Sequence, residues 1–123
     1  MNNRLAEQIS YLLLRHSYVV VPQLGGFIRE ALPASYQHEQ HLAYPPSAEL
    51  HFSQELQHSD GLLEARYALL LGISLRRARL ILEEEVKQLR HILIQRGQYQ
   101  LPLLGTLELT GAGKINFVPY SSS

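Results

Sequence analysis

The stretch that decides the fold is Val21-Pro22-Gln23-Leu24-Gly25-Gly26-Phe27, because its pattern returns 80 positions later as Leu101-Pro102-Leu103-Leu104-Gly105-Thr106-Leu107. Each copy follows a segment with helical spacing of apolar residues, and a repeat of both order and motif indicates a duplicated unit. A coincidental pair of glycine-bearing strands is the alternative, and the repeated helix-strand-strand order argues against it.

The repeated residues are suited to shaping the backbone and carry no chemistry of their own. Glycine accepts a positive φ or a close backbone approach, and proline at the start of a strand removes a donor where pairing has not begun. We therefore expect both copies to form the same bent strand. The signature residues are Pro22, Leu24, Gly25, Gly26, Pro102, Leu104 and Gly105.

Apolar spacing predicts three helices. The first covers residues 4–16, and the second covers 59–71 with Ser59 and Asp60 as caps. The third begins after Ser74, carries a long apolar stripe and ends at Gly97. The second helix carries the apolar residues Leu62, Leu63, Tyr67, Leu69 and Leu70.

Strands are predicted between and after these helices. Residues 18–30 should form a bent strand, 49–52 a second and 99–110 a third, followed by a tight turn at 111–113 and a strand at 114–118. Residues 31–47 are polar and contain three prolines, which predicts an exposed loop or arm. The fold class is therefore α+β, with halves at 1–59 and 60–123.

The composition favours a folded binding module. The net charge is zero, with 11 basic and 11 acidic residues, so no global field draws the chain to DNA or to an anionic membrane. Residues 1–60 hold three basic against six acidic residues, and 61–123 hold eight against five, which gives about −3 and +3. This asymmetry is expected either to attract copies of the chain to one another or to leave a basic face on the second half.

The sequence lacks the segments that would direct it to the secretory pathway or into a membrane. The chain has no cysteine, its N-terminus lacks the apolar run of a signal peptide, and no segment reaches the ~18 apolar residues of a membrane span. We expect a cytoplasmic location without membrane contact by these residues. Ser121, Ser122 and Ser123 are typical of the start of a linker into a longer protein.

The second half resembles the HU and integration host factor family. Its short helix, serine-capped long helix and strand at residues 100–107 are similar to that family's order and to its V-x-L-x-G-F-G-T-F strand. The first half is similar to a branch of HU-like domains found in Bacteroidetes at the N-terminus of proteins that end in a periplasmic SPOR domain. The blocks that carry this similarity are residues 19–27, 45–50 and 56–63.

The resemblance implies two tandem HU-like halves, each a helix plus a β-hairpin, packed as a single-chain pseudo-dimer or completed by homodimerisation. It also implies a membrane span and a SPOR domain after Ser123, with this module on the cytoplasmic side. The first half has one helix before its strands, and the second half ends before the closing helix of the family, so both arrangements stay open.

HU-type proteins bend DNA with long basic arms whose tips insert proline. Here residues 31–50 contain no lysine or arginine, so Pro45 and Pro46 are expected to form turns, and the turn at 111–113 is too short to be an arm. Weak, non-specific DNA binding would use a face of the helical segment. The candidates are Arg66, Arg76, Arg77, Arg79, Lys87 and Arg90, with Arg96 further along.

The same residues allow other interpretations. A solvated helix face is favoured by Glu83 and Lys87 at i,i+4 spacing. Residues 38–41, His-Glu-Gln-His, have histidines three apart in a loop and not four apart on a helix, so with His51 and His58 they are expected to be solvated and to bind no metal. Residues 110–114, Thr-Gly-Ala-Gly-Lys, lack the first glycine of a phosphate-binding loop and predict a hairpin turn.

These observations favour a protein that is not an enzyme and has no cofactor or small-molecule substrate. The primary hypothesis is an HU-like architectural, nucleoid-associated domain that contacts DNA through the arginine face. The alternative is an HU-derived module that binds a protein partner or itself, in a cell-envelope or division-associated protein.

Overall fold

The computed structural model describes residues 3–32, 35–37, 42–44 and 47–120. Each half of the chain contains a three-stranded antiparallel sheet, with strand orders β1-β2-β5 and β6-β7-β8. This arrangement confirms the α+β class and the tandem HU-like halves. The prolines at 33, 45 and 46, the histidines at 38 and 41, and the serines at 121–123 lie outside the described residues.

The first half consists of one helix and an extended sheet. Helix α1 (Arg4–Leu13) packs against β1 (Tyr18–Val21). Strand β2 (Gly25–Leu32) pairs with β1 and, from Gly26 to Leu32, with β5 (Ser47–Ser53). A two-stranded ribbon, β3 (Ser35–Gln37) and β4 (Leu42–Tyr44), extends beyond that sheet. We call residues 31–47 the arm.

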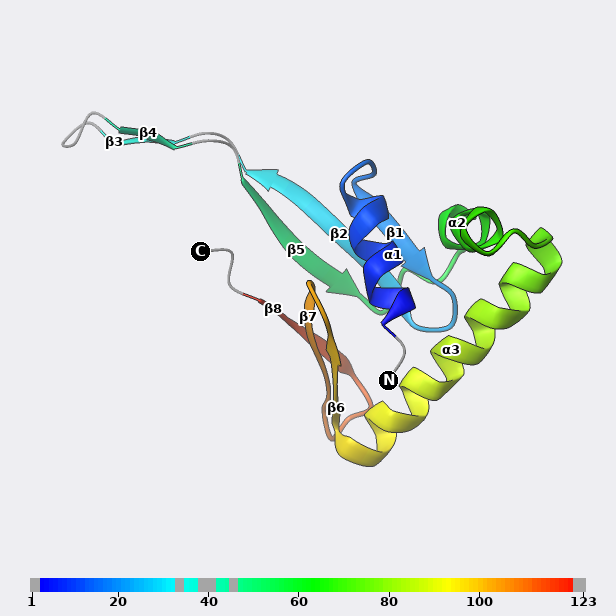
Figure 1. The fold of residues 1–123 in the computed structure, drawn as a ribbon. Coiled ribbons are helices and arrows are strands. Elements are labelled where there is room, and N and C mark those ends of the chain that lie inside the picture. Colours follow the sequence, from blue (N-terminus) through cyan, green and yellow to red (C-terminus); the bar gives the residue numbers. More distant parts are fainter. Residues whose placement is uncertain (1–2, 33–34, 38–41, 45–46, 121–123) are drawn as a thin grey trace.

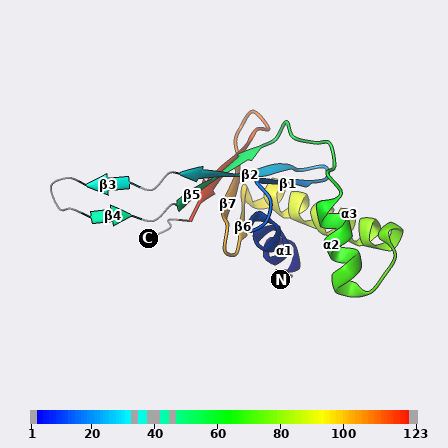
Figure 2. The same cartoon turned by 90° about the horizontal axis from the view of Figure 1, so that it is seen from above.

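Residues 31–47 were expected to form an exposed loop or arm, and the described residues of this segment form an arm. Leu32 pairs with Ser47, and pairing resumes between Ser35 and Tyr44. Hydrogen bonds between strand backbones do not require apolar side chains. The polar arm therefore continues the β2–β5 hairpin, although its sequence lacks the apolar–polar alternation of a half-buried strand. Figure 1 and Figure 2 show the ribbon pointing away from the body of the molecule, at the opposite end from the turn between α2 and α3.

The second half contains a helical pair before its sheet. Helix α2 (Leu62–Leu71) ends at Gly72, and α3 (Leu75–Arg96) begins at Ser74, whose Oγ accepts a hydrogen bond from the Arg77 backbone. Strands β6 (Gln98–Leu101), β7 (Gly105–Leu109) and β8 (Ile115–Pro119) follow. The expected stop at Gly97 and the hairpin turn at 111–113 are confirmed.

Helix α2 begins three residues later than expected. Its N-cap is Gly61, while Asp60 Oδ1 accepts from the Leu62 backbone and Ser59 Oγ accepts from the Gly61 backbone. Asp60 Oδ2 also accepts from the Val20 backbone at 3.0 Å, which fixes the aspartate against β1. Ser59 and Asp60 therefore stabilise the start of α2 from positions just before it, and Asp60 also links α2 to β1 of the first half.

The two halves close one core. Its fully buried members come from both halves, and they include Ile9 and Phe27 from the first and Leu82 and Leu107 from the second. The Phe27 ring packs against Phe52 at 5.0 Å between centroids and against Phe117 at 5.3 Å. This aromatic cluster spans both sheets and packs the two halves together.

Candidate nucleic-acid interface

The repeated motif forms the same hairpin turn twice, joining β1 to β2 and β6 to β7 as antiparallel pairs, which corrects the expected bent strand. Gln23 and Leu103 both take a positive φ, 65° and 73°, and Leu24 and Leu104 each donate a 3.1 Å backbone hydrogen bond three residues back. The glycines that follow have φ of 154° and 158°. Both Gln23 and Leu103 are exposed, and at the first turn the Gln23 backbone oxygen also accepts a hydrogen bond from Arg90 of α3.

Three of the candidate arginines gather at the start of α3. The side chains of Arg76, Arg77 and Arg79 are exposed, and the first turn of this helix holds no acidic residue. Within the described part of the chain, none of the three guanidinium groups has a hydrogen-bond or ion-pair partner. We call these three residues the arginine cluster.

Two other candidates are engaged inside the molecule. The Nε of Arg66 donates to Gln8 Oε1 at 2.7 Å, and its guanidinium lies 3.8 Å from the centroid of the Tyr11 ring. Arg90 donates to the backbone oxygen of Gln23. These contacts hold α1 and the first repeated turn against the helical pair, and sequence spacing alone gave no sign of either.

The remaining cations lie further along α3. Lys87 and Arg96 are both exposed. Glu83 forms no ion pair with Lys87 in the described residues, so the intrahelical pair proposed from the spacing is absent there. The structure thus brings together Arg76, Arg77 and Arg79 and leaves the other cations dispersed.

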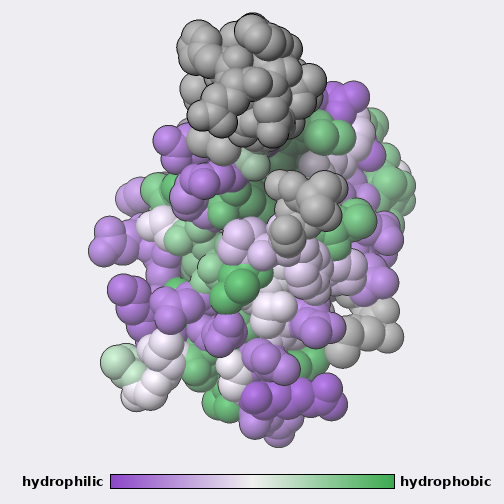
Figure 3. Space-filling model, turned by 90° about the vertical axis from the view of Figure 1, so that its left-hand side faces the viewer, coloured by the Kyte–Doolittle hydropathy of each residue, from purple (hydrophilic) through white to green (hydrophobic). Residues whose placement is uncertain are grey.

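A second feature is the groove between the edge strands β5 and β8. It has a volume of about 1300 Å³, and its charged lining residues include the acids Glu49 and Glu55 and the base Lys114. Viewed from the side of the arm, hydrophilic and hydrophobic residues are interspersed over the described surface and do not form one apolar patch (Figure 3). With two acids against one lysine, this lining offers a phosphate backbone little attraction.

The base of the arm carries a small polar group. Nε2 of His51 lies 3.2 Å from Glu30 Oε2 and 3.3 Å from Glu49 Oε2, and all three side chains are exposed. These are ligand types for a divalent cation, with donor atoms within 4.8 Å of one another. Their exposure and their contacts with each other account for the group as a polar contact on the surface of the paired strands β2 and β5.

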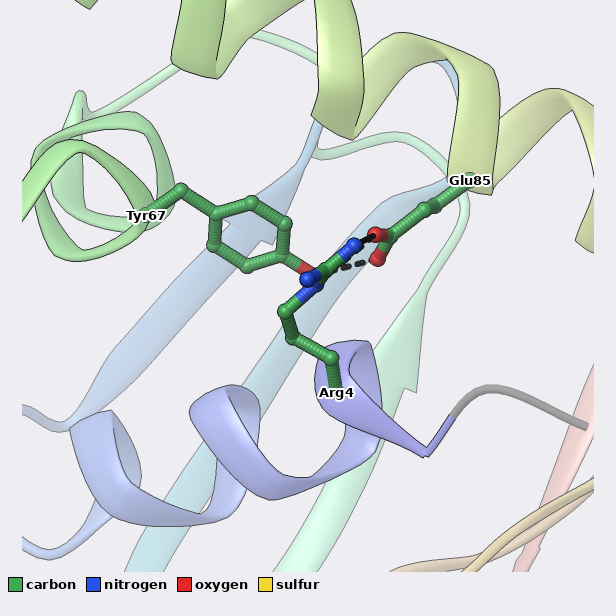
Figure 4. Close-up of polar contacts among 3 residues, drawn as sticks. All are labelled: Arg4, Tyr67 and Glu85. Carbon is green, nitrogen blue, oxygen red and sulfur yellow. Dashed lines mark hydrogen bonds and ion pairs between the residues drawn. The ribbon is translucent and has the colours of Figure 1, made fainter. Parts of the chain in front are cut away.

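A polar network of Arg4, Tyr67 and Glu85 joins the halves. Arg4 of α1 and Tyr67 of α2 both point at Glu85 of α3, as Figure 4 shows. The Nε and Nη2 atoms of Arg4 lie 2.9 and 2.6 Å from Glu85 Oε2, and the Tyr67 hydroxyl donates to Oε1 at 2.7 Å. The hydrogen bond to Glu85 raises the pKa of Arg4, and burial raises the pKa of Tyr67.

The sequence contained one unused signal for this network. Glu85 lies three residues after Leu82 and four before Leu89, which places it at the edge of the buried stripe, while Glu84 points to solvent. Among three successive glutamates, spacing could therefore have identified the one that turns inward.

Leucines are exposed next to the arginine cluster. Leu69 is 76% exposed, and Leu70 and Leu75 are also exposed. Of the apolar residues singled out in α2, only Leu63 and Tyr67 are fully buried, because a ten-residue helix at the end of the molecule contacts neighbours along one side. The α2–α3 end thus combines free cations with apolar side chains.

Comparison with known proteins gives two adjacent family matches. Residues 1–60 match the family model of CCDC81-like prokaryotic HU domain 1, and residues 61–123 match that of CCDC81-like prokaryotic HU domain 2. No curated protein and no solved structure matches the chain. In the part of the chain that the structure describes, the helices are too short or too polar to cross a membrane.

Proposed function

The chain belongs to the CCDC81-like prokaryotic HU domains, and from this premise we propose that it is a non-enzymatic architectural module that contacts DNA through the arginine cluster at the start of α3. The observation that carries the proposal is the exposure of Arg76, Arg77 and Arg79 without acidic neighbours in their turn. A guanidinium group fits a phosphate with two parallel hydrogen bonds.

The position of the cluster has an energetic cost that favours an external anion. Cations at a helix N-terminus oppose the macrodipole, by about 0.3–1 kcal/mol each at an exposed site. No partner within the described residues offsets that cost for Arg76, Arg77 or Arg79. A phosphate backbone laid across this turn would offset it.

The rest of the surface directs DNA to the same place. Residues 31–50 hold no lysine or arginine, so the arm has nothing to neutralise phosphates. The groove between β5 and β8 includes Glu49 and Glu55. The proposed contact is therefore electrostatic, non-specific and distant from the site where HU-type arms act.

A second candidate function is a protein-interaction module. It is favoured by the exposed leucines of α2 and by Leu75, because apolar side chains that are exposed close together are typical of protein-binding surfaces. A partner with an apolar, acidic face would fit the leucines and the arginine cluster together. The cytoplasmic location and the SPOR-domain context stay predictions.

Fluorescence anisotropy with a mixed-sequence duplex tests the proposal. Affinity should be measurable at low salt and should fall steeply as salt is added, with a log–log slope of about −0.9 per neutralised phosphate. Changing Arg76, Arg77 and Arg79 together to alanine should flatten the slope by up to about three phosphates. Lys114→Ala, which removes an exposed cation next to the β7–β8 turn, is the control and should leave it unchanged. Absence of binding at low salt contradicts the DNA proposal and leaves the protein-interaction module.

A further inference from the structure

Helix α3 carries a second stripe on the side opposite its buried residues. The buried side consists of Ala78, Leu82, Val86, Leu89 and Leu93. On the other side, exposed residues recur at alternating intervals of four and three, which is the 3.5-residue spacing of a helix that pairs with another helix. We call them the outer stripe: Leu80, Glu84, Lys87, His91 and Ile94.

The two ends of the outer stripe are apolar and unusually exposed. Leu80 is 59% exposed and Ile94 is 67% exposed. The stripe lines a shallow groove of about 810 Å³, with Gln23 at its rim. Because Arg90 donates to the Gln23 backbone oxygen, the rim is fixed against the helix and the surface is already formed in the single chain.

The middle of the outer stripe carries opposite charges without ion-pair partners. Within the described residues, neither Glu84 nor Lys87 forms an ion pair. A second α3 packed in parallel would place Glu84 beside Glu84 and Lys87 beside Lys87, and both contacts would be repulsive. An antiparallel α3 related by a two-fold axis midway between the two residues would place each Glu84 opposite Lys87 of the second copy.

We propose that the outer stripe of α3 is a self-association surface that pairs antiparallel with the outer stripe of a second copy of this chain. The two-fold axis makes the surface self-complementary, with two Glu84–Lys87 ion pairs at the centre. In this register, Leu80 of each copy lies within one helical turn of Ile94 of the other copy. This apolar contact therefore forms at both ends of the pair. The zero net charge of the chain means that two copies do not repel each other at long range.

The proposed α3–α3 contact is weak because it buries a small area. One helix face buries less than the roughly 1,200–2,000 Å² of a stable interface, so association should depend on concentration in the micromolar range or above. It differs from the contacts that complete an HU-like dimer, because both halves needed for the shared core are already present in one chain. It also stands independently of DNA binding, since it needs no nucleic acid.

Sedimentation velocity of the whole chain, without DNA, tests the pairing. The wild-type protein should move from the monomer of 14.0 kDa towards a dimer as its concentration rises. Glu84→Lys alone and Lys87→Glu alone should each weaken association at least about tenfold, because each puts like charges at the centre of the pair. The double variant Glu84→Lys/Lys87→Glu should recover wild-type association.

A mixture of the two single variants sharpens the test. In an antiparallel pair, the chain with two lysines meets the chain with two glutamates, so the mixture should dimerise although neither component does. Both side chains are exposed, and circular dichroism melting will verify that the variants fold. A wild-type protein that stays monomeric at all concentrations overturns the proposal. So does a dimer that ignores the single charge reversals, or a double variant and a mixture that both fail to associate.

Discussion

The two repeated turns depend on single glycines whose conformations a side chain cannot share. A Cβ at Gly105 would lie 2.7 Å from Pro119 Cα and 2.8 Å from Phe117 Cζ, and the φ of 158° is disfavoured for any other residue. At Gly25 the same atom would lie 2.6 Å from the backbone oxygen of Ser53. The duplication therefore preserved a backbone constraint in both halves.

Gly105→Ala should destabilise the protein by more than about 2 kcal/mol, because it adds backbone strain to a steric clash with β8. Gly25→Ala should cost a similar amount, because its surroundings are equally close. The measurement is the free energy of unfolding from urea denaturation.

Gly111→Ala is the matched control at a glycine of the β7–β8 turn. No atom lies within 4 Å of a Cβ at this position, so the free energy of unfolding should change by less than about 0.5 kcal/mol. Equal effects at Gly105 and Gly111 would show that the repeated turn does not constrain the fold.

At the scale of elements, some arginines of the helical pair α2–α3 bond other parts of the molecule, and others point to solvent. Arg66 lies over the Tyr11 ring and bonds Gln8, which ties α2 to α1, while Arg76 and Arg79 point to solvent. The same residue type thus has a structural role on one helix and is proposed to bind DNA on the other.

Arg66→Ala should lower the free energy of unfolding by about 1 kcal/mol, through loss of one hydrogen bond and one cation–π contact that are both partly exposed to solvent. The salt dependence of DNA binding should stay unchanged. Arg79→Ala should do the opposite, with no change in unfolding and a flatter salt slope. A loss of DNA affinity in Arg66→Ala without loss of stability would move Arg66 into the DNA interface.

Element positions could largely be predicted from the sequence, because they follow from local patterns. The Ser74 cap and the Gly97 stop each have a nearby residue that specifies them. The bent strands expected at 18–30 and 99–110 were wrong, because the chain reverses at each repeated motif and the segments on its two sides pair with each other. The paired arm could not be predicted in this way, because its pairing is made by the backbone of a polar segment. The partners of Arg66, Arg90 and Glu85 were also missed, because they lie far away in the sequence.

At the scale of the molecule, a polar network closes the interface between the halves. Arg4 contributes from the first half, and Tyr67 and Glu85 contribute from the second. Asp60 bonds the Val20 backbone, and Gln54 Oε1 accepts from the Ile115 backbone at 3.0 Å. Together with the shared core, these contacts predict that the halves unfold as one cooperative unit.

This network gives stability a dependence on alkaline pH. Burial raises the pKa of Tyr67 in the folded protein above its usual value near 10, and burial also raises that of Tyr99. A raised folded pKa contributes stability that is fully present below the unfolded pKa and is lost as pH rises through the folded pKa. The free energy of unfolding should therefore fall as pH increases above about 10.

Tyr67→Phe should reduce this fall, and Tyr99 should account for the slope that remains. The measurement is urea denaturation of both proteins at neutral pH and at several pH values above 10. An identical pH dependence in the two proteins would contradict the buried, protonated state of the Tyr67 hydroxyl.

The proposed DNA contact lies at one end of the molecule, and the arm lies at the other (Figure 1). A titration of ¹⁵N-labelled protein with a mixed-sequence duplex at low salt, followed by amide chemical shifts, distinguishes the two ends directly. Shifts should be concentrated in residues 74–80, around the arginine cluster, with β3, β4 and β5 unaffected. Shifts concentrated in the arm or along the β5–β8 groove, or no shifts at any site, would contradict DNA binding by the start of α3.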